Sequence, residues 1–205
     1  MKVQKEAIES INKRFAYLTN EVNNLSELNL NWQLEELLSK GKKAKDFKDV
    51  ESLKPYLLKR IEKIQAKKLQ DKKAYFEAIE NAPDFRSLKL TIEWKRSQTW
   101  GLNPTATLEV WNEQGFERVY VAKVSGCGYC KESAVMSDVF NQSLSLKKML
   151  LNASNENKTA YGMRGEKFSG GGVGVSSLQN AFSVCGFELK RVASGKSFNA
   201  YSINI

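Results

Sequence analysis

The chain has 205 residues, of which 41% are hydrophobic and 27% are charged, so one or two globular domains are expected and wholesale disorder is not. It contains no histidine, which excludes Ser-His-Asp and Cys-His catalysis within the chain and metal sites built on imidazole. Lys and Arg number 32 against 23 Asp and Glu, and the net charge of +9 favours a polyanionic partner, above all nucleic acid. The alternative is a lysine-rich surface without such a partner. We therefore expect a binding protein that is not an enzyme, with no cofactor and no metal.

The sequence gives no sign of a membrane partner. No apolar run approaches the roughly 20 residues that span a bilayer. Residues 1–6 lack the apolar segment of a secretory signal. The expected location is the cytoplasm.

Residues 1–85 are predicted to form a helical arm or small bundle. The first helix carries an apolar seam with alternating spacings of three and four, made of Ile8, Ile11, Phe15, Leu18, Val22 and Leu25. Such a seam packs either against another helix of the same chain or against a second copy. The spacing leaves both open, so a homodimer through the N-terminal helices is one of the two expectations.

A basic stripe is predicted on the second long helix, which spans Val50–Ala82 and follows a short helix at Trp32–Lys40 and a charged connection at Lys42–Lys48. Between Lys54 and Lys73 the sequence has eight basic residues and two acidic ones. The candidate residues for nucleic-acid or partner binding on this helix are Lys59, Arg60, Lys63 and Lys67.

Residues 86–205 are predicted to form an α+β domain with an antiparallel sheet, because the hydrophobic period changes from 3.6 to 2. Three neighbouring strands, Leu88–Lys95, Ala106–Trp111 and Phe116–Val124, come first. They are followed by helices at Lys131–Asn141 and Leu144–Leu151, an irregular strand at Tyr161–Phe168, a helix at Val175–Cys185 and a closing hairpin of Phe187–Val192 and Phe198–Ile205. The predicted order is roughly βββα–β–α–ββ.

A glycine-rich loop at residues 170–174 precedes a predicted helix. Backbone N–H groups at such a helix start can hold a phosphate, with Arg164 and Lys167 just upstream. The candidate loop residues are Gly171, Gly172 and Gly174. A plain connecting loop is the alternative.

A second candidate loop, residues 96–105, joins the first two predicted strands. Its Trp100, beside Arg96, can stack on a base or insert into a partner. It can equally fold back on the sheet as a lid.

Cys127-Gly128-Tyr129-Cys130 resembles the redox motif of thioredoxin-superfamily proteins, especially bacterial disulfide isomerases. The resemblance implies that Cys127 is the nucleophile and Cys130 the resolving thiol. That superfamily also places a cis-proline after the motif, whereas Pro55, Pro83 and Pro104 all precede it. A thiol–disulfide oxidoreductase is therefore the alternative function, and a tight turn with small cysteines is the structural one.

Four segments, 92–97, 99–106, 125–129 and 170–175, resemble a group of small uncharacterised proteins carried by phages and plasmids. The resemblance implies a mobile-element gene product in a host bacterial cytoplasm. Such genes often encode inhibitors of host defence, including inhibitors of RNA-guided (CRISPR-type) nucleases.

The predicted order of three strands, glycine-rich turn and helix is also similar to a double-stranded-RNA-binding domain, in which the helix start faces phosphates. Lys131 is the base at that position. The function expected from all these features is binding to nucleic acid or to a host nucleoprotein complex, and a helical oligomerisation module is a further alternative.

Overall fold

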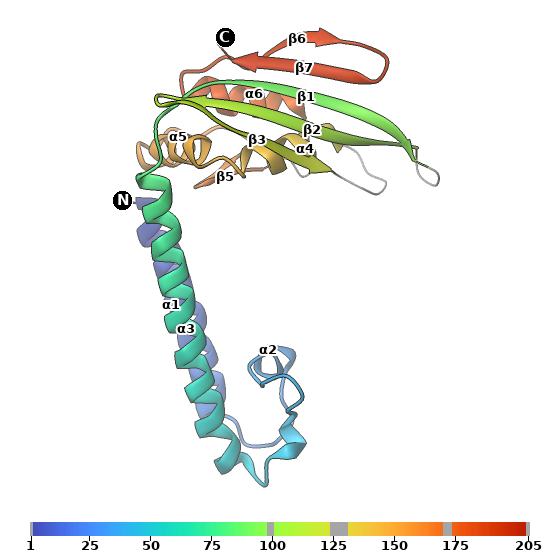
Figure 1. Ribbon diagram of the computed structural model, residues 1–205. Coiled ribbons are helices and arrows are strands. Elements are labelled where there is room, and N and C mark those ends of the chain that lie inside the picture. Colours follow the sequence, from blue (N-terminus) through green and yellow to red (C-terminus); the bar gives the residue numbers. More distant parts are fainter. Residues whose placement is uncertain (1, 98–100, 124–130, 170–173, 204–205) are drawn as a thin grey trace. The chain divides into compact units, whose positions relative to one another are not determined.

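The computed structural model describes residues 2–97, 101–123, 131–169 and 174–203 (Figure 1). The chain divides into two compact units, Met1–Glu77 (unit 1) and Ala78–Ile205 (unit 2). A helical region is followed by an antiparallel sheet with helices, so the predicted α+β class is confirmed. Within the described residues, no helix is both long and apolar enough to cross a membrane.

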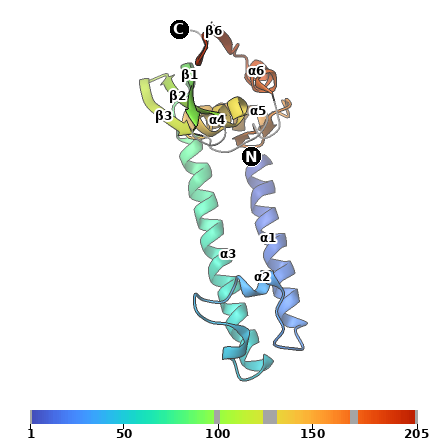
Figure 2. The ribbon, with the colours of Figure 1, turned by 90° about the vertical axis from the view of Figure 1, so that its right-hand side faces the viewer.

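Unit 1 is built on two long helices, α1 (Lys2–Asn23) and α3 (Val50–Glu80), which run side by side in opposite directions (Figures 1 and 2). The apolar seam of α1 is used inside the unit. Its buried members are Phe15, Leu18 and Val22, which share a core with Leu53, Leu57 and Ile61 of α3 and with Leu30, Leu34 and Leu37 of the connecting segment. Association with a second copy stays a prediction.

The connection between the long helices holds α2 (Trp32–Glu35) and a short 3-10 helix (Ala44–Asp46). Asn31 is the N-cap of α2, a position that asparagine favours, and its Oδ1 accepts a hydrogen bond from the Leu34 backbone N–H at 3.0 Å. The prediction of a helix through Lys40 was wrong, since α2 ends at Glu35. The chain tightens there into i→i−3 bonds, and the Leu37 carbonyl accepts a hydrogen bond from Arg60 Nε at 3.1 Å.

Unit 2 is a five-stranded antiparallel sheet in the order β3-β2-β1-β7-β6. Its strands are β1 (Phe85–Ser97), β2 (Gly101–Asn112), β3 (Gly115–Lys123), β6 (Lys190–Ser194) and β7 (Phe198–Ile203). The helices α4 (Lys131–Phe140), α5 (Leu144–Asn155) and α6 (Val175–Val184) lie on the same side of the sheet (Figures 1 and 2).

The alternation read from the sequence determines which face of the sheet is buried. Leu88, Leu90 and Ile92 of β1 are fully buried, and each faces a buried residue of β2 across the ladder. The intervening residues of both strands point to the other face, where Lys89 and Glu109 lie 3.9 Å apart. Beneath the buried face, Phe168 stacks on Phe182 with ring centroids 5.1 Å apart.

Two predicted boundaries in the sheet were wrong. The expected loop at residues 96–105 is mostly strand, because β1 continues to Ser97 and pairs there with Gly101. The expected strand Phe187–Val192 begins only at Lys190. Before that point Phe187 packs on Phe85 with centroids 4.9 Å apart, and the Leu189 carbonyl accepts a hydrogen bond from Gln179 of α6 at 2.9 Å.

The irregular strand expected at 161–168 is a small hairpin of two-residue strands, β4 (Met163–Arg164) and β5 (Lys167–Phe168). The side chain of Asn141, just after α4, satisfies both backbone hydrogen-bonding groups of Phe168, as a neighbouring strand would. Its side-chain amide donates to the Phe168 carbonyl and accepts from the Phe168 N–H, both at 2.8 Å. These bonds attach the hairpin to the helical layer.

We predict that Phe182→Ala lowers the free energy of unfolding by about 3–5 kcal/mol. The fully buried ring contacts three other phenylalanines, and its removal leaves a cavity among them. Urea denaturation followed by near-ultraviolet circular dichroism measures this change. Tyr161→Ala is the control, since that ring is 71% exposed. A loss below about 1 kcal/mol for Phe182→Ala would show that the aromatic cluster does not hold the helices to the sheet.

Candidate nucleic-acid interface and neighbouring polar sites

The exposed basic face of α3 is the candidate interface. Lys59, Lys63 and Lys67 are spaced four residues apart, which places their side chains on one face of the helix at intervals of roughly 6 Å along its axis. All three are exposed. In the part of the chain that the structure describes, none of the three has an ion-pair or hydrogen-bond partner.

Arg60 borders this basic face but is held differently. It is half-buried, and its Nε bond to the Leu37 carbonyl ties α3 to the segment after α2. A groove of about 450 Å³ begins beside it and is lined by Arg60, Lys63, Ile64, Lys67, Lys68 and Asp71. Aliphatic lysine stems and Ile64 give this groove an apolar floor under a basic rim.

The predicted bases of unit 2 lie in two separate places. Arg164 and Lys167 are exposed and face each other across the β4–β5 hairpin. This hairpin lies beside the start of α6, because a Cβ added at Gly162 would be only 3.2 Å from the Ser177 carbonyl oxygen. Gly174 is the N-cap residue of α6 and supplies no side-chain cap. Gly171 and Gly172 lie outside the described residues, so the phosphate loop stays a prediction.

Lys131 is the first residue of α4, and its Nζ lies 3.4 Å from Asn103 Oδ1 of β2. It therefore joins a helix start to the sheet. Arg96 lies in β1 opposite Leu102. Trp100, Cys127 and Cys130 lie outside the described residues, so base stacking and thiol chemistry at these positions stay predictions.

One polar cluster that sequence reasoning missed surrounds Glu132, in the first turn of α4. Its Oε1 accepts hydrogen bonds from the Tyr201 hydroxyl and from Asn199 Nδ2, the latter at 3.1 Å, and lies 3.8 Å from Arg191 Nη2. Burial, followed by the hydrogen bond to the Glu132 carboxylate, raises the pKa of Tyr201 to about 12. The Tyr201 hydroxyl joins β7 to α4 as a hydrogen-bond donor to Glu132.

A second cluster joins β3 to the start of α5. Glu117 accepts hydrogen bonds from Ser143 Oγ at 2.8 Å, from the Ser145 hydroxyl and from Tyr120 Oη at 2.6 Å. Ser143 is also the N-cap of α5, so the carboxylate lies where the helix dipole favours a negative charge. Burial, the largest cause, and the bond to Glu117 raise the pKa of Tyr120 far above its usual value. Both clusters hold the fold together.

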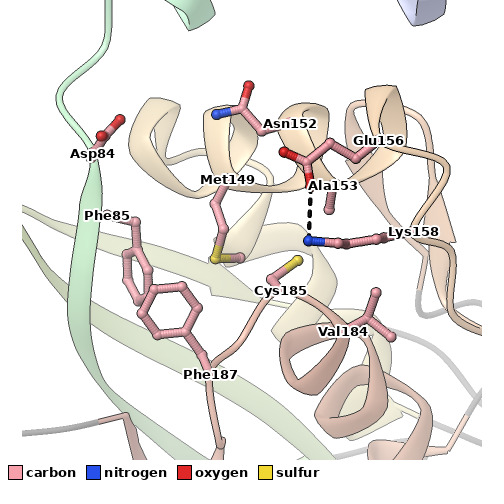
Figure 3. A pocket seen from close by; sticks show the side chains of 10 residues that line it. All are labelled: Asp84, Phe85, Met149, Asn152, Ala153, Glu156, Lys158, Val184, Cys185 and Phe187. Atoms are coloured by element: carbon pink, nitrogen blue, oxygen red, sulfur yellow. Dashed lines mark ion pairs between the residues drawn. The ribbon is translucent and has the colours of Figure 1, made fainter.

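A cavity of about 310 Å³ opens in unit 2 between the start of β1, the ends of α5 and α6 and the segment that follows each helix (Figure 3). Its lining residues are Asp84, Phe85, Met149, Asn152, Ala153, Glu156, Lys158, Val184, Cys185 and Phe187. Lys158 Nζ and Glu156 Oε2 form an ion pair at 2.8 Å. Burial raises the pKa of the Cys185 thiol to about 11, and the charge of Lys158 opposes the shift only in part.

Sequence reasoning placed Cys185 at the end of a predicted helix and Phe187 in a predicted strand, and it did not group the lining residues as a site. No local motif marks this cavity, because its residues come from chain positions 84–187 and meet only in the folded unit. Within the described ranges, no three Cys, Asp or Glu side chains are grouped as a metal site would require. The cavity is thus a mixed apolar and charged hollow.

Comparison of the chain with protein-family models, with curated proteins and with solved structures finds no match in any of the three.

We predict that Cys185 is poorly reactive at pH 8. A rise of the thiol pKa from 9.0 to about 11 lowers its thiolate fraction roughly 100-fold, and the thiolate is the nucleophile. Timed alkylation with iodoacetamide is carried out in buffer and in about 8 M urea. Peptide mass spectrometry then gives the alkylation rate of Cys185 in the native and in the unfolded chain. The native rate should rise steeply between pH 9 and pH 11. Equal native and denatured rates at pH 8 would contradict the buried, protonated thiol.

Proposed function

We propose that this protein binds nucleic acid without chemical turnover, through phosphate contacts made by the exposed basic face of α3. The observation that carries the proposal is the row Lys59, Lys63 and Lys67, which projects three ammonium groups from one rigid helix without a neutralising partner among the described residues. A regular row of cations on a helix complements the regular charge of a phosphate backbone. The net charge of +9 adds a long-range attraction.

Binding is a better account than catalysis because of the protonation states in unit 2. The whole sequence lacks histidine, the side chain whose ordinary pKa is closest to neutral. The half-buried Tyr120, the buried Tyr201 and the Cys185 thiol all have their pKa raised, which favours their neutral forms. A nucleophile or general base needs the opposite shift.

The proposed contacts recognise the nucleic-acid backbone and carry no base specificity, since lysines on a helix face meet phosphates without reading base edges. The resemblance to phage and plasmid proteins supplies a setting for the proposal. In that setting the target is host nucleic acid or a nucleoprotein complex of the host, and inhibition of a host-defence complex is the biological role that we propose.

The test replaces Lys59, Lys63 and Lys67 together with Gln. Fluorescence anisotropy with labelled duplex and single-stranded oligonucleotides, repeated over a series of NaCl concentrations, measures affinity and its salt dependence. We expect wild-type binding to weaken steeply with salt. The triple variant should lose about three units of the log–log salt slope with the duplex, because each phosphate contact contributes roughly 0.9, and about two units with the single strand, where each contributes roughly 0.7.

The matched control replaces Lys95, Lys123 and Lys196, three exposed lysines of unit 2, with Gln. It lowers the net charge by the same amount at a different place and should keep most of the affinity and slope. Absence of wild-type binding at low salt would contradict the proposal. Equal losses in the two triple variants would show that net charge matters and the α3 face does not.

A further inference from the structure

The cavity of unit 2 has an aromatic and thioether wall. Phe85 and Phe187 line it together with Met149, and the two rings meet edge to face with centroids 4.9 Å apart (Figure 3). Cys185 adds a thiol that stays neutral at physiological pH. A volume of about 310 Å³ is at the lower end of the range of small-molecule sites. This wall suits the apolar body of a small ligand.

Among the residues that line the cavity, carboxylates outnumber bases, although the whole chain is strongly basic. Two carboxylates line it, Asp84 and Glu156, against one base, Lys158. Lys158 is already paired with Glu156 at 2.8 Å, and Asp84 with Lys148 outside the lining at 2.7 Å. Each charged side chain of the lining thus has a partner of opposite sign, so an incoming anion meets no unpaired base and an incoming cation must compete with Lys158 or Lys148 for a carboxylate.

Two helix ends strengthen this bias. The cavity residues Asn152 and Ala153 belong to the last turn of α5, and Val184 is the last residue of α6. Both helices therefore present their C-terminal ends, where the macrodipole is negative and favours a cation. Lys158 follows α5, and its ammonium group lies beside the Glu156 carboxylate.

We propose that this cavity binds a small organic ammonium ion, with its charge near Glu156 and the two helix ends and its alkyl groups against the rings of Phe85 and Phe187. A cation is attracted by the ring faces and by the negative ends of both helix dipoles, so these two contributions have the same sign. The Lys158 ammonium group competes with this ligand for Glu156. The site does not depend on the α3 face, so nucleic-acid binding and ammonium binding can fail independently.

Choline is the probe, and isothermal titration calorimetry with the full chain at constant ionic strength measures its affinity. The neutral isostere 3,3-dimethyl-1-butanol has the same shape without the charge. We expect choline to bind at least two- to fivefold more tightly than this alcohol, as cation–π attraction at a partly exposed site allows. Equal affinities, or tighter binding of benzoate than of choline, would overturn the proposal.

A substitution at Lys158 distinguishes a cation site from an anion site by the direction of its effect. Lys158→Gln leaves Glu156 without its partner and should strengthen choline binding several-fold, whereas Glu156→Gln should weaken it. Lys190→Gln is the matched control, because Lys190 forms an exposed pair with Glu188 at 2.9 Å outside the cavity and should leave the affinity unchanged. Weaker binding of choline to Lys158→Gln would overturn the proposal.

The location of the bound probe is tested through Cys185. Choline should slow the alkylation of Cys185 by iodoacetamide at pH 9.5, as quantified on the Cys185 peptide by mass spectrometry, and the neutral alcohol should protect it less. Protection should disappear in Phe187→Ala. If that variant unfolds, the Lys158→Gln result still decides the question. Unchanged alkylation at saturating choline would show that the ligand binds elsewhere and would contradict the site.

Discussion

Burial of a single face of the sheet by α4, α5 and α6 is the constraint on which unit 2 depends. The strictly alternating residues of β1 and β2 send their apolar members into a core with Phe140, Phe168 and Phe182. The opposite face carries charges and hydroxyl groups together with the exposed side chains of Val119 and Val121. Because the helices cover only one face, their ends meet the rim of the sheet, and the polar clusters form there.

These clusters show how buried or half-buried polar groups are satisfied at the rim. The Glu117 carboxylate accepts hydrogen bonds from the two serines at the start of α5. The Glu132 carboxylate accepts them from Tyr201 and Asn199 of β7. Each carboxylate lies near the start of a helix, where the dipole stabilises a negative charge. The C-terminal ends of α5 and α6 meet instead at the cavity, where the same dipoles favour a positive charge. The starts of α4 and α5 thus differ in electrostatic preference from the ends of α5 and α6.

Unit 1 follows the same logic with helices alone. Its leucine-rich core occupies one side of α3, which leaves the face of Lys59, Lys63 and Lys67 free for solvent or a partner. Arg60 lies between the two sides, and its Nε donates a hydrogen bond to the Leu37 carbonyl. The lysines of α3 form a basic surface because the apolar residues of this helix are buried on its other side.

The sequence by itself determined the type of most elements, the α+β class, the excess of positive charge and the absence of histidine chemistry. Periods of 3.6 and 2 record which side of an element is buried, and this is a local property. The periods do not record what covers that side. The strands extend to Ser97 and Gly101 because their ladder pairing continues after the hydrophobic alternation stops. Phe187 was expected in a strand but instead packs on Phe85 before the strand begins.

Only the tertiary structure decided the partners of Glu132 and Asp84, because these partners are distant in the chain. Glu132 meets Tyr201, and Asp84 lines a cavity with Cys185, across separations that no spacing rule anticipates. The row of lysines on α3 was visible in the sequence, since a helix fixes its own faces. The cavity was not, because it exists only where three segments of the chain, residues 84–85, 149–158 and 184–187, converge.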